Sequence, residues 1–214
     1  MANITFSPRE ALRFGWNTTK VHWRFLAWAT LAVGLASSVP KAIAKKLKHA
    51  DHDVLGFAVS VLGWILYVTF ELGFIHASLK FASGLKGEFE DFFPTFQTFW
   101  RYFVASLLYG LIVIGGLVLL VIPGVIWAIK FQFYPYFILD KNMRPKEALK
   151  ASARITSGVK WELFLFGLLL IGIVLLGALA FVVGLFFAVP TAMLAMSFVY
   201  RRLLERSENV SPVS

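Results

Sequence analysis

Glu71 and Lys130 are the residues of this sequence whose types and positions point most directly to chemistry. Each is a charged side chain inside a long apolar run, and a lone charge near the centre of a bilayer is costly unless a partner or water relieves it. Glu71 lies nine residues before Lys80, and Lys130 lies ten residues before Asp140. At about 1.5 Å per residue, both are predicted roughly 13–15 Å from the inner ends of their helices. An ion pair between two helices requires such a match in depth.

Three interpretations of these two charges stay open on the sequence alone. They form a structural ion pair between helices, or each extends to a separate interface, or they belong to a proton or solute relay. Gln132 and Thr191 are candidates to extend such a polar site, Thr191 because it lies ten residues before Arg201 and so at a similar depth. The relay would make the chain a small-solute or ion transporter that uses Glu71 and Lys130.

Pro135 and Pro190 lie inside predicted spans. A proline lacks the backbone N–H that would bond to the carbonyl four residues earlier, so each frees a carbonyl oxygen. Within a membrane, that oxygen needs a polar partner or a cavity.

Basic residues recur at helical spacing in two segments that begin with proline. Lys146, Lys150 and Arg154 are four residues apart and form a basic stripe on one face of a predicted helix. Arg9 and Arg13 lie four residues apart on the predicted N-terminal helix, among apolar residues. Such stripes suit the phosphates of membrane lipids, and they equally suit anchors that only fix topology. The sequence does not separate these two roles.

The segment His49-Ala50-Asp51-His52-Asp53 contains residue types that bind divalent metals. It is short and hydrophilic and has no second group of ligands nearby in the sequence, so we interpret it as a solvated loop and expect no metal and no cofactor. The chain has no cysteine, which excludes disulfides and thiolate chemistry. Nucleophile-elbow, zinc-protease and phosphate-loop motifs do not occur, so we expect no enzymatic activity.

The composition is that of a membrane protein. Of the 214 residues, 58% are hydrophobic and 16% are aromatic, and the mean hydropathy is +0.73. A soluble domain could not cover so much apolar surface. The net charge of +9 would suggest nucleic acid as a partner of a soluble protein, but basic residues beside apolar runs instead fit anionic headgroups. We expect membrane lipids as partners, with other membrane proteins or a second copy of the chain as further candidates, and no nucleic acid.

The apolar runs predict an all-α, polytopic bundle of about six spans, arranged as three hairpins with amphipathic interfacial helices on the cytoplasmic side. The predicted spans are residues 23–40, 54–78, 102–121, 125–139 and two within 163–200. A polar loop at 41–53 separates the first two spans. The segment Val121-Ile122-Pro123-Gly124 is the predicted turn of the second hairpin, because Pro-Gly is a strong turn signal, and Gly184 is the predicted turn of the third.

An internal repeat supports this division. The segment Pro8-Arg9-Glu10-Ala11-Leu12-Arg13 matches Pro145-Lys146-Glu147-Ala148-Leu149-Lys150 when Arg and Lys stand for each other. Proline suits the first helical position in both, and Ser7 is a candidate cap for the first helix. We predict a single integral membrane domain over 1–214, with repeat-like units at 7–80, 84–140 and 144–203, and a disordered polar tail at 204–214.

The distribution of basic residues predicts the orientation. Most of the 21 Lys and Arg residues lie in the N-terminal helix, in 80–101, in 140–160 and at the C-terminus. Because basic loops stay in the cytoplasm, both termini are predicted there. The four lysines between residues 41 and 48 are the exception, since this model places them outside.

The C-terminal half resembles a bacterial family of six-helix integral membrane proteins of unknown function. The residues that carry the resemblance are Ile122-Pro123-Gly124, Tyr134-Pro135-Tyr136-Phe137-Ile138-Leu139-Asp140, Glu147-Ala148-Leu149-Lys150-Ala151-Ser152, Gly158-Val159-Lys160-Trp161, Leu163-Phe164, Pro190 and Phe198-Val199-Tyr200. Related domains form the membrane part of some glycerophosphodiester phosphodiesterases. The resemblance implies a six-helix bundle in a bacterial cytoplasmic membrane and carries no catalytic residue to transfer.

These observations together predict a non-enzymatic, membrane-embedded accessory or lipid-interacting protein. The lipid headgroup candidates are Arg9, Arg13, Lys146, Lys150 and Arg154. The alternative is the small-solute or ion transporter, with its polar site at Glu71 and Lys130 and with Gln132 and Thr191 as further members.

Overall fold

The computed structural model describes residues 6–50 and 52–210, and the described residues form helices without a strand. The helices are α1 (Pro8–Val21), α2 (Trp23–His49), α3 (Asp53–Ala82), α4 (Phe96–Leu119), α5 (Val121–Phe131), α6 (Tyr134–Lys141), α7 (Pro145–Ile155), α8 (Lys160–Leu179) and α9 (Phe181–Val210). A short 3-10 helix, η1 (Phe89–Phe92), lies between α3 and α4. The predicted all-α class is confirmed.

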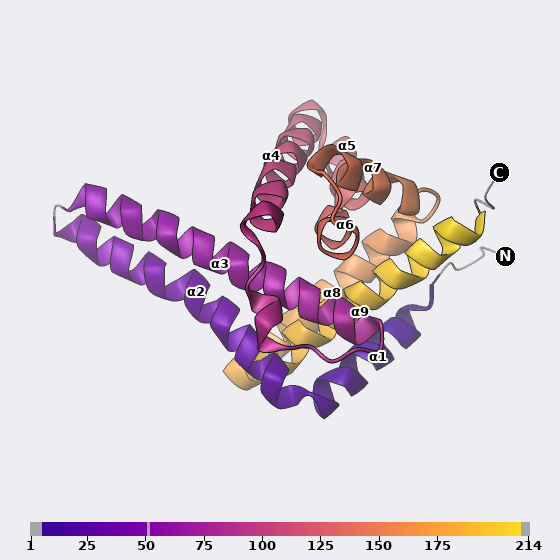
Figure 1. The fold of residues 1–214 in the computed structure, drawn as a ribbon, viewed down its shortest axis with the longest axis horizontal. Helices are drawn as coiled ribbons and strands as arrows, with labels where there is room; N and C mark the ends of the chain where they lie inside the picture. The colour runs from indigo at the N-terminus through magenta and orange to yellow at the C-terminus, as the bar shows by residue number, and fades with distance from the viewer. Residues whose placement is uncertain (1–5, 51, 211–214) are drawn as a thin grey trace.

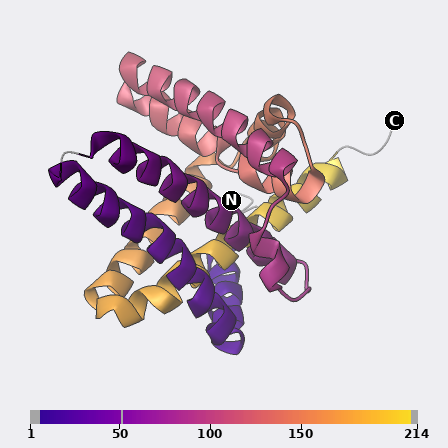
Figure 2. The same cartoon turned by 60° about the vertical axis from the view of Figure 1, so that its left-hand side comes forward.

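Three pairs of consecutive helices pack side by side, namely α2 with α3, α4 with α5, and α8 with α9 (Figure 1). In Figure 2 the turns that close these pairs all lie on the left, whereas the C-terminus lies on the right. We call the end with the three turns the tip. The opposite end, with α6, α7 and the C-terminal part of α9, is called the base.

Six helical segments are long and apolar enough to cross a membrane. They are α2, α3, α4, the stretch from Val121 to Lys141 that contains α5 and α6, α8, and α9 from Val183 to Asn209. Large apolar side chains cover their outer surfaces, for example Val54, Val118 and Leu179, which are 83%, 81% and 79% exposed. Exposed apolar surface of this extent is unfavourable in water and favourable in lipid. The chain is therefore a multi-pass membrane protein.

The first pair of helices is longer than predicted. α2 continues through Pro40 to His49, and α3 begins at Asp53. The predicted polar loop at 41–53 is wrong for residues 41–49, which are helical because Lys and Ala residues with high helix propensity fill them. The lysines at 41, 45, 46 and 48 thus lie on the last turns of α2, at the tip.

The second turn lies directly before the predicted segment 121–124, and the third lies before Gly184. The chain turns at Leu120, which has extended backbone angles, and Pro123 lies in the first turn of α5, where no helical N–H is required. It turns again at Ala180, and Gly184 lies inside α9. A Cβ atom at Gly177 would lie 3.0 Å from the carbonyl oxygen of Gly184. These glycines serve the close approach of α8 and α9, so the predicted turn at Gly184 is wrong.

The C-terminal region is more helical than predicted. α9 continues to Val210, so the prediction of a disordered tail is wrong for residues 204–210, and residues 211–214 lie outside the described part of the chain. Leu203 is buried, and Ser207 donates a hydrogen bond to the carbonyl of Leu204 at 2.8 Å. Leu203 and Leu204 pack against the core of the base, and most of the residues that follow them in α9 are exposed.

Pro135 breaks the helical stretch between Val121 and Lys141 into α5 and α6. Two side chains at the end of α7, Ser152 and the cap residue Thr156, bind the backbone at this break, although neither binds the carbonyl of Phe131, four residues before Pro135. Ser152 Oγ donates to the carbonyl of Lys130 at 3.1 Å and accepts from the N–H of Phe133 at 3.0 Å. Thr156 Oγ1 donates to the same Lys130 carbonyl at 3.0 Å. The polar helix α7 therefore stabilises an irregular backbone that hydrocarbon would not tolerate.

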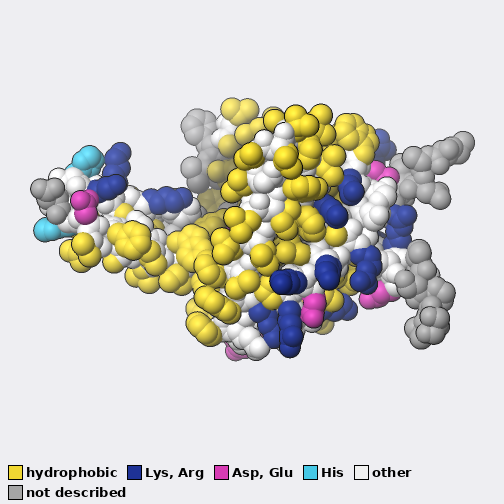
Figure 3. Space-filling view, turned by 90° about the horizontal axis from the view of Figure 1, so that it is seen from above, with side chains coloured by type: hydrophobic (Ala, Val, Ile, Leu, Met, Phe, Trp, Pro, Cys, Tyr) yellow, Lys and Arg dark blue, Asp and Glu magenta, His cyan; other side chains and the backbone are white. Residues whose placement is uncertain are grey.

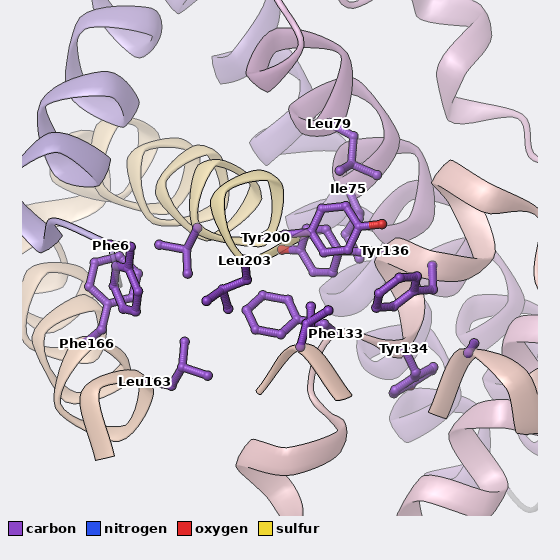
Figure 4. Packing of buried hydrophobic residues seen from close by; sticks show 14 of the residues in the cluster. Phe6, Ile75, Leu79, Phe133, Tyr134, Tyr136, Leu163, Phe166, Tyr200 and Leu203 are labelled. Atoms are coloured by element: carbon purple, nitrogen blue, oxygen red, sulfur yellow. The ribbon is translucent and has the colours of Figure 1, made fainter. Parts of the chain in front are cut away.

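The main hydrophobic core lies at the base. Tyr200 of α9 is fully buried and packs against Tyr136 and Phe137 of α6, with ring centroids 5.2 Å away in each case. Figure 4 shows Tyr200 beside Tyr136. Phe6 and Phe166 meet edge to face at 5.5 Å in the same cluster. Residues of α1, α3, α6, α7, α8 and α9 meet there. Because the core lies at one end, the helix pairs leave it as extended arms.

Candidate functional site

Glu71 and Lys130 do not form the expected ion pair. Within the described residues, the carboxylate of Glu71 has no Lys, Arg or His nitrogen within 4.0 Å. Lys130 Nζ lies instead over the ring of Phe131, 5.2 Å from its centroid. The pair was predicted from matched depth alone, but depth does not fix the direction in which each side chain leaves its helix. The ion-pair interpretation is therefore wrong.

Glu71 lies among tyrosines. Tyr67 precedes it by one helical turn on α3, and its phenol interacts with the carboxylate. The carboxylate also acts electrostatically on the phenols of Tyr102 on α4 and of Tyr134 and Tyr136 on α6. Tyrosines of three helices thus lie within electrostatic range of one carboxylate.

The tyrosines on α4 and α6 belong to a connected polar cluster. The hydroxyls of Ser106 and Tyr134 lie 2.8 Å apart, and Tyr109 donates to the carbonyl of Ala128 at 3.3 Å. The ring of Tyr134 stacks near that of Tyr102, with centroids 5.8 Å apart, and lies 5.3 Å from that of Tyr109. We call Tyr67, Glu71, Tyr102, Ser106, Tyr109 and Tyr134 the Glu71 cluster. It can hold a proton or bind a small polar group.

A pocket between α2 and α3 reaches one end of the Glu71 cluster. Its volume is about 410 Å³, and Ser37, Lys41, Ser60 and Tyr67 supply its polar lining. Lys41 Nζ donates to Ser37 Oγ at 3.2 Å. The phenol that interacts with Glu71 therefore also lines a partly polar pocket.

Neither of the other two predicted members of the polar site has a hydrogen bond to the Glu71 cluster within the described residues. Thr191 is buried between α9 and α1, where its hydroxyl donates to Thr19 Oγ1 at 3.3 Å. Gln132 lies at the end of α5, and its Nε2 is buried without a hydrogen-bond partner in the described residues. The prediction that Thr191 extends the Glu71 site is not fulfilled, because α1 covers it. Thr191 is a packing contact.

The five predicted headgroup residues all lie on exposed faces. On α1, Arg9 and Arg13 are exposed while Ala11, Gly15 and Thr19 are buried. On α7, the buried residues are Ala148, Leu149, Ser152 and Ile155. Lys146, Lys150 and Arg154 are exposed on the other face. We call Arg9, Arg13, Lys146, Lys150 and Arg154 the basic set.

Both helices of the basic set belong to the base. Ala11 of α1 and Ala148 of α7 are buried in the same core cluster, and both helices contact α9. In Figure 3, Lys and Arg side chains gather on the half of the molecule opposite the α2–α3 tip, and a second basic and histidine group marks that tip. Two separate surfaces therefore carry positive charge, one at each end.

Sequence reasoning missed an ion-pair network at the base. Asp140 on α6 accepts from Arg201 and from the hydroxyl of Tyr200, both on α9. In the sequence analysis, Asp140 and Arg201 only define the inner ends of predicted spans, and no contact between them is predicted. Their equal depth was the one signal that could have paired them. Arg101 at the start of α4 likewise binds the carbonyl and the side chain of Asn142.

A second charged group lies on the same end, where η1 meets α3. Lys80 Nζ lies 2.6 Å from Asp91 Oδ1 and 3.7 Å from Glu88 Oε2, and His76 Nδ1 lies 3.7 Å from Asp91. These residues line a polar pocket of about 220 Å³. The contacts hold η1 against α3, so the group is structural.

The segment 49–53 spans the tip of the first arm, and Asp51 lies outside the described residues. In the part of the chain that the structure describes, no three His, Asp or Glu side chains gather in a metal-binding arrangement. The interpretation of this segment as a solvated loop stays a prediction.

Comparison with known proteins gives a family and relatives, each without an assigned function. A family described as "Protein of unknown function (DUF975)" matches residues 111–207. An uncharacterised protein of Mycobacterium bovis and one of Mycobacterium tuberculosis are each 30% identical over 149 residues, which is 70% of this chain and 45% of the relative. The chain is similar to proteins of unknown function.

The chain spans less than half of the length of the curated relatives that it matches. No solved structure matches it significantly. The resemblance to the membrane domain of some glycerophosphodiester phosphodiesterases receives no support from these matches and stays a prediction.

Proposed function

We propose that this chain is a non-enzymatic protein of a bacterial cytoplasmic membrane that binds anionic phospholipids through the basic set. In this proposal three hairpins cross the membrane with their turns outside, namely α2 with α3, α4 with α5 and α6, and α8 with α9. The helices α1 and α7 lie at the cytoplasmic interface with both termini. The protein acts as an accessory component that couples other membrane proteins, or a second copy, to anionic lipid.

One observation carries the proposal. The two polar helices of the chain both bury their apolar faces in the base and expose all five residues of the basic set. An amphipathic helix with a basic outer face is the usual device for holding anionic headgroups. Each such residue near the surface of an anionic membrane contributes about 1 kcal/mol of attraction.

The test is lipid preference in nanodiscs. Purified protein is reconstituted with mixtures of phosphatidylcholine and phosphatidylglycerol, and the lipids that stay bound after transfer to detergent are quantified by mass spectrometry. We expect enrichment of phosphatidylglycerol in wild type. Replacing Arg9, Arg13, Lys146, Lys150 and Arg154 by Gln should reduce this enrichment by about tenfold or more, because the summed attraction exceeds the 1.4 kcal/mol of one decade.

The matched control lies at the other end of the molecule. Lys45, Lys46 and Lys48 are exposed on the last turns of α2, and their replacement by Gln should leave the enrichment intact. Equal loss in both variants would show unspecific charge attraction, and unchanged enrichment in the first variant would overturn the proposal. Unfolding midpoints of all variants are compared so that misfolding is recognised.

A second candidate function is favoured by the pocket between α2 and α3. The pocket reaches Tyr67, which interacts with Glu71, and this arrangement suits a transporter of small polar solutes or protons. In proteoliposomes with an entrapped pH dye, the Glu71→Gln variant should lose proton flux if this function holds. Lys130→Met is the control, because Lys130 lies over Phe131 and takes no part in the Glu71 cluster.

A further inference from the structure

A groove runs between α5 and α8 on the outside of the bundle. Its volume is about 520 Å³. α5 lines it with Val121, Ile122, Val125, Ile126 and Ile129, and the first turns of α8 contribute Lys160, Trp161 and Phe164. The spacing of the α5 residues places them on one face of that helix. The groove is thus lined by apolar side chains and by a single charged residue, Lys160.

The dimensions of the groove match one lipid chain. The lining residues of α5 extend from position 121 to 129, which is about 12 Å along the helix at 1.5 Å per residue. One leaflet of a bilayer core is about 15 Å thick, half of the usual 30 Å. An acyl chain lying along α5 would therefore be in contact with the protein over most of its length.

The charged end of the groove lies where the headgroup of such a lipid would be. α5 runs from the turn at Leu120 towards the base, and α8 begins at the base with Lys160. Trp161 next to it is 69% exposed. Lysine and tryptophan at the end of a span are the residues that meet phosphate and the interfacial layer. The charge of Lys160 therefore suits the phosphate of an anionic headgroup.

We propose that the groove between α5 and α8 is a binding site for one anionic phospholipid, with an acyl chain along α5 and the phosphate at Lys160. This inference rests on the proposed function and names a distinct site, since none of the basic set lines the groove. A second copy of the chain is the competing occupant, and it would have to leave Lys160 without an anion or supply an acidic residue.

The experiment is photo-crosslinking in nanodiscs with phosphatidylglycerol that carries a diazirine on its acyl chain. Labelled peptides are mapped by mass spectrometry. We expect labels on residues 121–129 and 160–164 in several-fold excess over exposed positions elsewhere on the spans. Labels spread in proportion to exposed area would mean ordinary contact with the bilayer and would overturn the proposal.

Variants test whether a lipid chain occupies the groove and whether Lys160 gives a preference for an anionic headgroup. Val125→Trp fills the groove and should abolish the excess labelling, whereas Leu169→Trp, on an exposed position of α8 outside the groove, should preserve it. Lys160→Gln should remove the preference for phosphatidylglycerol over phosphatidylcholine in the groove labels while keeping the labels themselves. Excess labelling that survives Val125→Trp in a folded protein would overturn the site.

Two further readouts separate this inference from the others. Replacement of the basic set by Gln should leave the groove labels unchanged, so a failure of the proposed function is distinguishable from a failure of this site. Protein–protein crosslinks between residues 121–129 of two chains, together with a dimeric mass in nanodiscs, would assign the groove to a second copy and overturn the lipid proposal.

Discussion

Arg201 binds the carboxylate of Asp140 with two guanidinium nitrogens, Nη2 at 2.7 Å from Oδ1 and Nη1 at 3.1 Å from Oδ2. The pair joins α6 to α9 at the base. The side chains of Asp140 and Arg201 are only 12% and 25% exposed, and Tyr200 donates a further hydrogen bond to Asp140 at 3.1 Å. A two-point bond of this kind fixes both the distance and the rotation of the two helices.

Asp140→Asn should therefore destabilise the protein by about 2–3 kcal/mol, because it leaves a partly buried guanidinium without its counter-charge. The Nε of Arg201 has no partner within the described residues, and the guanidinium lies over the ring of Tyr200, 5.8 Å from its centroid. The measurement is the unfolding midpoint in detergent. Glu205→Gln is the control, since it breaks an exposed pair with Arg202 one turn further on and should cost less than about 0.5 kcal/mol. Equal effects would contradict the assignment.

Ser152 should be essential for the break between α5 and α6. Ser152→Ala removes the acceptor of the Phe133 N–H and one donor to the Lys130 carbonyl, and an unpaired buried backbone group costs about 1–3 kcal/mol. We expect a lower unfolding midpoint and faster hydrogen exchange at Phe133. Ser157→Ala, at an exposed position in the loop after α7, should change neither. Normal protection of Phe133 in the first variant would refute this role.

Gly15 should be required for the close packing of α1 against α9. A Cβ atom there would collide with the carbonyl of Thr191 and lie 3.3 Å from the N–H nitrogen of Ala195. Gly15→Ala should loosen α1, lower the unfolding midpoint and expose the N-terminal segment to protease. Gly34→Ala is the matched control on α2, where a Cβ meets no atom within 4 Å, and it should be neutral or stabilising by up to about 1 kcal/mol. The same loss in both variants would count against this packing.

The energetic coupling of Glu71 should be to Tyr67 and not to Lys130. A double-mutant cycle of Glu71→Gln with Lys130→Met should give a coupling energy below about 0.5 kcal/mol, the limit for residues that share no contact. The cycle with Tyr67→Phe should give about 1 kcal/mol, a typical net value for one hydrogen bond. Unfolding in detergent supplies the free energies. A larger coupling energy between Glu71 and Lys130 than between Glu71 and Tyr67 would contradict this prediction and support an ion pair.

The class and the number of spans could be predicted from composition because apolar runs of the required length have no other stable environment. The starts of α1 and α7 were also predictable. Proline begins both helices, and Ser7 accepts from the N–H of Glu10 at 3.3 Å as a cap. These features depend on a few neighbouring residues, so the sequence alone determines them.

The turns were less predictable because glycine has two uses. Gly124 and Gly184 suggested turns, but both lie inside helices and allow close packing of a neighbouring helix. A sequence does not show which neighbour approaches a glycine. Only the packed structure separates a turn from a helix contact.

The polar sites required the tertiary structure most of all. Glu71 and Lys130 were matched in depth, yet the direction of each side chain around its helix brought Glu71 to tyrosines and Lys130 to Phe131. Asp140 and Arg201 are 61 residues apart and meet only because α6 and α9 pack together. The sequence by itself determined the position of each of these groups along its apolar run. The tertiary structure decided which of them touch, because contact depends on helix rotation and helix order as well as on depth.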